Sequence, residues 1–269
     1  MTTPAKVWDY RDLIKNFVIR DLRSRYKRSF LGWGWSLINP AVTLGIYTLV
    51  FGFFLNGTAP VTGNGESTSF ALWLFSALVA WNAFSSGING AMQSFLASGH
   101  LLTRTYFPPE TPVVAGTLTV AIQTAVESVI LVGCMVLLGN LAWTTLFILP
   151  IMLLLTLFAF GIGMMVSLMN VRFRDINYLV GIFLQIGFYA TPIVYRIDQL
   201  PKEVGGVNIA LVLKFNPMTH FVLAMRRVTY LLVPPTPTQW IIMVSAAVVS
   251  VLVGWTVFGR RAPMYIEEI

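Results

Sequence analysis

Long stretches without a charged residue alternate with short polar segments along the chain. A helix of roughly 20 residues crosses the hydrocarbon core of a bilayer. The uncharged stretches cover residues 29–65, 67–103, 128–171, 176–195 and 228–259. Each is long enough to cross, so the pattern predicts an all-α polytopic membrane protein.

A hydropathy window of about 19 residues resolves these stretches into six transmembrane helices. The predicted spans are residues 36–55, 70–92, 113–138, 141–169, 178–194 and 239–258. Gly139 and Asn140 form a turn signal between spans three and four, which predicts a helical hairpin. Residues 195–238 are charged and bounded by prolines, and they form an insert between spans five and six.

Residues 217–233, within this insert, are apolar enough to suggest a seventh span. Arg226 and Arg227 would lie near its centre, and each would cost about 2.5 to 3.5 kcal/mol there. Helical spacing of the apolar residues instead favours an amphipathic helix lying at, or dipping into, the membrane surface. Those apolar residues are Phe221, Met225, Val228 and Leu232.

The distribution of charge predicts the orientation. An even number of spans puts both termini on one side, and that side collects thirteen of the 18 Lys and Arg residues. By the positive-inside rule, both termini are cytoplasmic. The net charge of +7 suits anionic membrane lipids, which we expect as partners in place of nucleic acid.

Composition narrows the class of protein further. Hydrophobic residues make up 56% of the chain and charged residues 11%, whereas soluble domains carry about 25% charged residues. The mean hydropathy is +0.74. A single cysteine, Cys134, excludes a disulfide framework and a thiolate metal cluster, so we expect no metal site.

An amphipathic segment precedes the first span. Ile14, Val18 and Leu22 recur at four-residue intervals among basic side chains, which predicts an interfacial helix. The basic residues nearest the membrane are Arg25, Lys27 and Arg28. This dense cluster suits an anionic phosphate at the inner leaflet, and a plain topology anchor is the alternative.

Within the spans, Glu127 is the acidic residue, and Gln123 lies one turn earlier on the same helix face. An intramembrane carboxyl group is a functional candidate, although a packing role is equally open. Aromatic residues in the spans could stack on sugar rings in a conduit or pack against neighbouring helices. These conduit candidates are Tyr47, Phe51, Trp73, Trp81, Phe84 and Tyr189.

Motifs for nucleotide chemistry do not occur in the sequence. The chain has no GxxxxGK[ST] loop to cradle phosphates, no HExxH and no CxxC. It also has no Asp-x-Asp pair to hold a metal-bound nucleotide sugar. We therefore expect a non-catalytic chain without a cofactor of its own, and any ATP and Mg²⁺ would bind a partner subunit.

Four segments together resemble the permease subunits of type-two ABC exporters for lipid-linked surface polysaccharides. They are RYKRSFLGWGWSLINP (25–40), YFPPETPVV (106–114), NVRFRDI (170–176) followed by YATPIVY (189–195), and NPMTHFVLAMR (216–226). They occur in the matching order and cover nearly the whole chain. The resemblance implies a single membrane domain, residues 1–269, in the bacterial inner membrane.

The resemblance also implies a division of this domain and a set of partners. Residues 1–35 would form the interfacial helix and lipid-access loop, 36–194 spans one to five, 195–238 external gate helices, 239–259 span six, and 260–269 a cytoplasmic tail. The gate helices would cover roughly 201–213 and 217–232. The partners would be a second copy of the chain, two ATP-binding cassette subunits and an undecaprenyl-pyrophosphate-linked polysaccharide.

Site residues follow from the matched positions. The lipid pyrophosphate would meet Arg23, Arg25, Tyr26, Lys27 and Arg28. Coupling to the ATPase would use His100, Leu101, Leu102, Thr103, Arg104, Thr105, Tyr106 and Phe107, with Arg172, Arg174 and Asp175 nearby. The external gate would include Asn216, Pro217, His220, Phe221 and Arg226.

Two other classes of protein remain open from the residues. A proton-coupled secondary transporter would use Glu127, and a membrane glycosyltransferase would need acidic or nucleophilic groups at one interface. The cargo also remains open between O-antigen, teichoic acid, galactan and capsule-like polymers.

Overall fold

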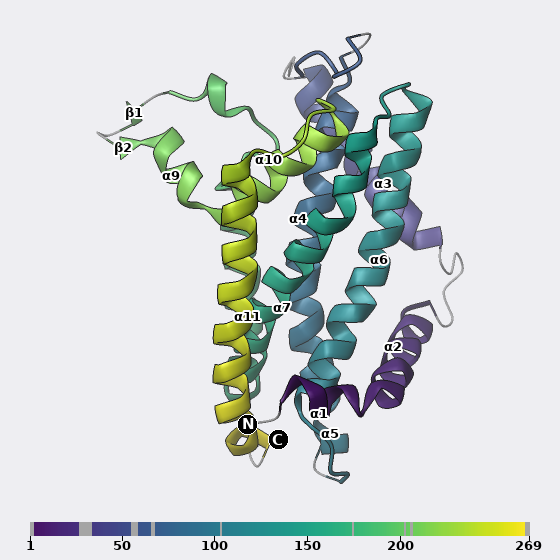
Figure 1. Cartoon of the computed structure of the whole chain (residues 1–269), viewed down its shortest axis with the longest axis vertical. Helices are drawn as coiled ribbons and strands as arrows, with labels where there is room; N and C mark the ends of the chain where they lie inside the picture. Colours follow the sequence, from purple (N-terminus) through teal and green to yellow (C-terminus); the bar gives the residue numbers. More distant parts are fainter. Residues whose placement is uncertain are drawn as a thin grey trace.

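The computed structural model describes residues 3–26, 34–54, 59–65, 68–102, 104–173, 175–201, 203–204 and 207–266. These residues are predominantly helical (Figure 1). The elements are α1 (Pro4–Trp8), α2 (Arg11–Tyr26), α3 (Trp35–Tyr47), η2 (Thr48–Phe54), α4 (Phe70–Ala97), α5 (Gly99–Leu102), α6 (Glu110–Leu137), η3 (Trp143–Phe147), α7 (Ile148–Arg172), α8 (Ile176–Tyr189), η4 (Ile197–Gln199), β1 (Glu203–Val204), β2 (Val207–Asn208), α9 (Ile209–Phe215), α10 (Pro217–Thr229) and α11 (Pro237–Ile266).

Four elements among the described residues are long and apolar enough to cross a membrane. They are α4, α6, α7 together with η3, and α11. They confirm the predicted spans two, three, four and six. Figure 1 shows them running along the long axis of the molecule, with α7 packed against both α11 and α4, and α4 against α6.

The helices at the predicted spans one and five are shorter. In the first region α3 has 13 residues with Pro40 inside it, and a seven-residue π-helix, η2, follows. In the second, α8 has 14 residues and ends at Tyr189, before Pro192. A helix needs roughly 20 residues to cross a bilayer. The segment of α3 and η2 is no longer than this, and α8 is shorter, so the six-span layout stays a prediction.

Two glycines allow α7 and α11 to approach closely. A Cβ atom on Gly161 would lie 2.2 Å from the carbonyl carbon of Ser250, and one on Gly254 would lie 2.3 Å from the carbonyl oxygen of Gly161. Backbone would occupy the space of any side chain at these two positions. The helix pair therefore depends on small residues, as is common between membrane helices.

The turn between α6 and α7 follows the prediction from Gly139 and Asn140. Gly139 has φ +65°, which favours glycine. Its N–H bonds to Val136 O at 3.1 Å, and the Asn140 N–H bonds to Met135 O at 2.8 Å. This pair of bonds is the Schellman ending of a helix, and it satisfies carbonyl groups that the last turn leaves free.

The insert between the predicted spans five and six differs from its prediction in one part. Residues 201–213 are not a single helix, because β1 and β2 form a small antiparallel hairpin before the seven-residue α9. The sequence Gly205-Gly206 between the strands favours a hairpin turn and disfavours helix. The second predicted element is α10, and ten of its 13 residues are buried.

Tyr230, directly after α10, joins three segments at the end of the molecule away from the termini. Its hydroxyl donates to Pro60 O at 2.5 Å and accepts from the Ser69 N–H at 3.2 Å. Its carbonyl accepts from the Gly63 N–H at 2.9 Å and from Asn140 Nδ2 at 3.1 Å. The end of α10 is thus tied to the segment before α4 and to the α6–α7 turn.

The N-terminal helices lie at the opposite end, where Figure 1 also places both termini. The apolar side of α2 is buried against α6 and the segment before it. Phe17 of α2 meets Phe107 there, with ring centroids 6.0 Å apart. Much of the apolar stripe of this helix therefore packs against protein.

Candidate functional site

One side of α4 carries polar side chains inside an otherwise apolar helix. Asn82, Ser86, Asn89 and Gln93 are spaced by four, three and four residues, which places them on one face. We call these four residues the polar ladder; all four are at least partly exposed. Eleven residues of α-helix rise about 16 Å, roughly half the thickness of a bilayer core.

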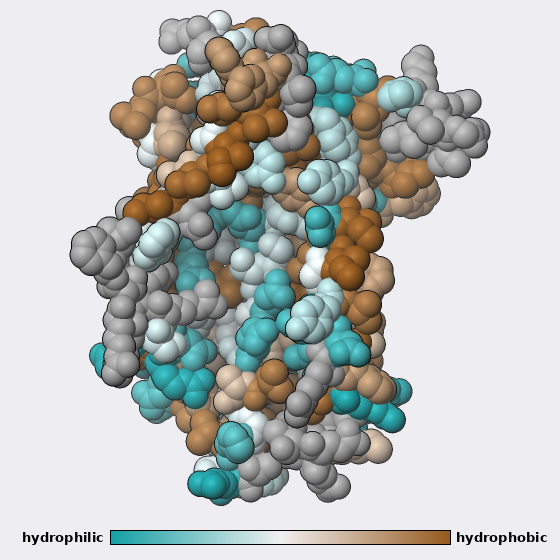
Figure 2. All heavy atoms as spheres, turned by 180° about the vertical axis from the view of Figure 1, so that it is seen from behind, coloured by the Kyte–Doolittle hydropathy of each residue, from teal (hydrophilic) through white to brown (hydrophobic). Residues whose placement is uncertain are grey.

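A polar cleft of about 300 Å³ opens beside the ladder, between α4 and α2. The lining residues are Asp21, Ser24, Ser86, Asn89, Gly90, Gln93, Ser94 and Ala97. The Ser94 hydroxyl donates to Asp21 Oδ2 at 3.4 Å and links the two walls. Figure 2, the view opposite to Figure 1, shows hydrophilic side chains gathered in a hollow along the middle of the molecule, flanked by hydrophobic ones.

Glu127 of α6 lies next to the upper end of the ladder. Asn82 Nδ2 donates to Glu127 Oε2 at 3.5 Å. The two helices come this close lower down as well, because a Cβ atom on Gly116 would lie 2.3 Å from Ser94 Oγ. The intramembrane carboxyl group is thus bound to a ladder amide.

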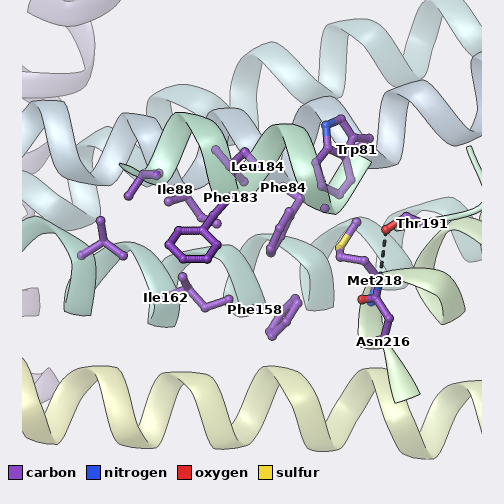
Figure 3. Close-up of a pocket in the computed structure, with 13 residues that line it drawn as sticks. Trp81, Phe84, Ile88, Phe158, Ile162, Phe183, Leu184, Thr191, Asn216 and Met218 are labelled. Atoms are coloured by element: carbon purple, nitrogen blue, oxygen red, sulfur yellow. Dashed lines mark hydrogen bonds between the residues drawn. The ribbon is translucent and has the colours of Figure 1, made fainter. Parts of the chain in front are cut away.

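An apolar cavity of about 350 Å³ lies between α4, α7, α8 and α10 (Figure 3). Two of its aromatic rings, Phe84 and Phe158, stack with centroids 5.3 Å apart. At one end, Asn216 Nδ2 donates to Thr191 Oγ1 at 3.0 Å, the dashed line of Figure 3. The walls of the cavity are therefore apolar, and its polar groups Thr191 and Asn216 lie at one end.

The six aromatic conduit candidates lie in different places. Trp81 and Phe84 line the apolar cavity, and Tyr47 stacks on Phe188 with centroids 6.0 Å apart. Trp73 is buried, whereas Tyr189 is 60% exposed. The side chain of Phe51 lies outside the described residues.

Arg226 is a buried cation in the last turn of α10. Its Nε donates to Trp73 O at 3.3 Å, its Nη1 to Pro192 O at 2.6 Å and its Nη2 to Ile193 O. The guanidinium carbon also lies 3.4 Å from the centroid of the Trp73 ring, a cation–π contact. These groups replace water around the charge, so Arg226 joins α10 to α4 and to the chain after α8.

The start of α10 contains the other predicted gate residues. Asn216 Oδ1 accepts from the Met218 N–H at 3.0 Å, and Pro217 occupies the first helical position, which it favours. His220 Nε2 lies 2.9 Å from Lys214 O, which joins α10 to α9. Phe221 is fully buried. The structure thus brings all five predicted gate residues onto one capped helix.

The predicted coupling segment forms α5 and the chain after it, at the end that holds the termini. The exposed members are His100, Leu101, Arg104, Thr105 and Tyr106, of which Tyr106 is 97% exposed. Leu102 packs on the same buried cluster as Val171, which precedes Arg172. The two predicted coupling loops thus share one end of the bundle. Arg172 and Asp175 are exposed, and Thr103 and Arg174 lie outside the described residues.

The residues predicted to meet the lipid pyrophosphate are described only in part. Arg23 is exposed on α2. Arg25 and Tyr26 belong to the same helix, but their side chains lie outside the described residues, as do Lys27 and Arg28. The described part of α2 places Arg23 two residues from Asp21, which lines the polar cleft.

Sequence analysis missed the polar ladder. A signal was present, since amide and hydroxyl residues at intervals of four, three and four occur within a run free of charged residues. Hydropathy averaging hides such a stripe, because its apolar neighbours dominate the window. The ladder also has no charged residue, which is the usual sign of a functional site inside a span.

Known proteins resemble this chain over most of its length. The O-antigen export system permease protein RfbA of Myxococcus xanthus is 26% identical over 98% of both chains. RfbA of Klebsiella pneumoniae is 26% identical over 80% of this chain and 79% of its own. The polysialic acid transport protein KpsM of Escherichia coli is 23% identical over 78% of both. Residues 12–230 match the family described as ABC-2 type transporter, and the chain therefore belongs to that family.

Proposed function

We propose that this chain is the permease subunit of an ATP-driven exporter that moves a polysaccharide on an undecaprenyl-pyrophosphate carrier across the bacterial inner membrane. The observation that carries the proposal is similarity to an O-antigen export permease over 98% of both chains. The exposed polar ladder supports it independently, because a hydroxyl-rich polymer needs polar groups in place of the water it leaves.

The proposed topology has six spans, with α3 and η2 as the first and α8 as the fifth, and with both termini in the cytoplasm. The common position of the termini in Figure 1 supports an even number of crossings. α2 would lie at the cytoplasmic interface, and α9 and α10 would form the external gate. In this arrangement the Arg226 contacts hold the gate helix against α4.

Energy for export would come from two ATP-binding subunits that bind ATP and Mg²⁺, and a second copy of this chain would complete the pathway. The chain itself has no phosphate-binding loop. Tyr106 and its exposed neighbours offer a docking surface beside a well-packed helix end. ATP-driven closure of the partner subunits would push on this surface.

The lipid carrier would enter beside the C-terminal end of α2. Arg23, Arg25, Lys27 and Arg28 would attract its pyrophosphate, since each basic residue near an anionic surface contributes about 1 kcal/mol. The polar cleft is lined by Asp21 and Ser24 of α2 and leads to the ladder. The two features together give the charged head group and the sugar polymer separate places.

Purification of the chain with its genomic neighbours tests this function. We expect an ATP-binding subunit in equal amount, ATP hydrolysis that depends on it, and surface polysaccharide that disappears when either gene is deleted. A chain that purifies alone and moves substrate without ATP would contradict the proposal. A glycosyltransferase would instead transfer sugar as the isolated chain.

A further inference from the structure

We propose that the polar ladder contacts the polymer during export and selects uncharged, hydroxyl-rich polysaccharide over polyanionic polysaccharide. The inference rests on the proposed function and adds the chemical class of the cargo. It concerns the wall that the sugar chain meets inside the membrane, whereas the basic segment near residues 23–28 concerns the carrier.

The ladder has the hydrogen-bonding chemistry of a sugar site. Amide and hydroxyl groups both donate and accept, as sugar hydroxyls do. Asn89 uses Nδ2 to reach Ser85 O at 2.9 Å, and Gln93 uses Nε2 to reach Asn177 Oδ1 at 3.3 Å on the exposed side. The carbonyl oxygens of these amides can accept further bonds, and the adjoining cleft has room for part of a sugar chain.

The ladder is poorly suited to face lipid. A polar group that moves from water to hydrocarbon loses its hydrogen bonds to water, and this loss is unfavourable. The ladder donors Asn82, Asn89 and Gln93 each have one protein partner, but their other polar sites lie on an exposed face of a membrane-spanning helix and would still lose water there. Water or a polar polymer is the medium in which this face is stable.

Charge decides between neutral and anionic polymers. No Lys or Arg occurs at residues 29–103, 105–171 or 175–195, so the helices proposed as the first five spans contain no cation. Among the described residues that line the cleft or bond to the ladder, the ionisable ones are acidic: Asp21 in the cleft wall and Glu127, which accepts from Asn82. Arg20 pairs with Asp21 at 3.0 Å and so already has an anionic partner.

Among the described residues, Arg226 is the buried cation, and it is not directed to the ladder. Arg226 gives its donors to three backbone carbonyl groups and its face to Trp73. Beyond the basic segment near residues 23–28, a carboxylate or phosphate on each sugar would meet Glu127 along α4, a helix that has no Lys or Arg of its own. Like charges repel more strongly at a low effective dielectric constant than in water. A neutral polymer avoids this repulsion and keeps its hydrogen bonds.

The test uses the complete exporter, with its ATP-binding subunit, in two hosts. One host makes a neutral polysaccharide and the other a polyanionic polysaccharide, both on the same undecaprenyl-pyrophosphate carrier. We expect wild type to display the neutral polymer about tenfold or more above the polyanionic one. Asn89→Leu combined with Gln93→Leu should lower neutral export about tenfold, because two residues that can bond to sugar hydroxyls are lost. Asn89→Lys should raise the share of the polyanionic polymer at the surface.

Ser245→Leu is the matched control, because Ser245 is an exposed hydroxyl residue on α11 that bonds to its own helix at Ile242 O. It should export at the wild-type rate. Equal display of both polymers by wild type would overturn the inference, as would normal neutral export by the double leucine variant. If the double leucine variant no longer associates with a second copy of the chain, the inference is also overturned, and the ladder is assigned to contact between copies.

The proposed function fails in a different way from the inference. If the ATP-binding subunit does not co-purify and neither polymer reaches the surface, both are wrong. If the complex assembles, hydrolyses ATP and exports the two polymers equally, the exporter stands and only the selection of neutral cargo is wrong.

Discussion

The guanidinium carbon of Arg226 lies 3.4 Å from the centroid of the Trp73 ring, and Arg226 Nε donates to the carbonyl of the same tryptophan at 3.3 Å. One residue of α4 thus receives the cation through both its ring and its backbone. Pro192 and Ile193 complete the shell. The position of α10 in the bundle depends on this charge.

Arg226→Met should destabilise the protein by about 3 to 5 kcal/mol, because three carbonyl groups lose a charged donor in a buried site. Thermal unfolding of the purified protein in detergent measures the effect. Arg227→Met is the control, since Arg227 bonds to Pro234 O at an exposed site and should cost about 1 kcal/mol or less. Equal losses for both variants would contradict the assignment.

Gly161→Ala should destabilise the α7–α11 pair by about 1 to 3 kcal/mol, because the new methyl group would meet the Ser250 backbone at 2.2 Å. Gly133→Ala is the matched control in α6, where a Cβ atom meets nothing within 4 Å. That variant should be neutral or slightly stabilising, since alanine favours helix. The same unfolding assay compares the two, and a neutral Gly161→Ala would refute the close approach.

Reversal of Arg25, Lys27 and Arg28 to glutamate should lower export about tenfold or more, since each basic residue contributes roughly 1 kcal/mol near an anionic surface. The ATP-binding subunit should still co-purify. Reversal of Lys6, Arg11 and Lys15 to glutamate changes the net charge equally, at exposed positions that come earlier in the N-terminal segment. That control should export nearly normally, and unchanged export in both variants would remove the first cluster from lipid loading.

Tyr106→Ala should weaken binding of the ATP-binding subunit about tenfold, because an exposed aromatic side chain at an interface commonly contributes 1 kcal/mol or more. Co-purification and coupled ATP hydrolysis report the loss. Phe215→Ala serves as the control, since Phe215 is 79% exposed on α9, which is distant from α5 in Figure 1. Equal effects of the two substitutions would point to general destabilisation.

Glu127→Gln should leave an exporter that responds to ATP and is insensitive to a protonophore. Glutamine keeps an oxygen that can accept from Asn82 Nδ2, so the contact between α4 and α6 survives. Export assayed with and without a proton gradient gives the result. A wild type that stops when the gradient collapses, and a Gln variant that is inactive, would favour the proton-coupled alternative.

Sequence patterns predict the long elements of this fold well. Spans two, three, four and six are apolar enough on average for hydropathy to identify them, and Gly139 marks the hairpin between two of them. The same window treats residues 36–55 and 178–194 as equivalent spans, although Pro40 and Pro192 interrupt or follow shorter helices there. Local backbone chemistry, which averaging ignores, makes the difference.

Tertiary partners explain the remaining differences. An arginine in an apolar helix indicates a surface position when considered alone, and only the fold shows that Trp73, Pro192 and Ile193 enclose Arg226. Hydropathy likewise does not separate the uncovered side of α4 from its buried side. The polar cleft forms only because α2 lies against the polar side of α4, and this packing is not visible in the sequence.

The bonds of Tyr230 set an order for biogenesis. Chains emerge from the ribosome N-terminus first. Pro60, Gly63 and Ser69 are therefore synthesised 161 to 170 residues before the tyrosine whose hydroxyl and carbonyl they meet. Until that residue emerges, the segment before α4 lacks its bonds to Tyr230, so this end of the bundle closes only late in synthesis. A nascent chain that stalls earlier exposes this end to proteases that survey the membrane surface.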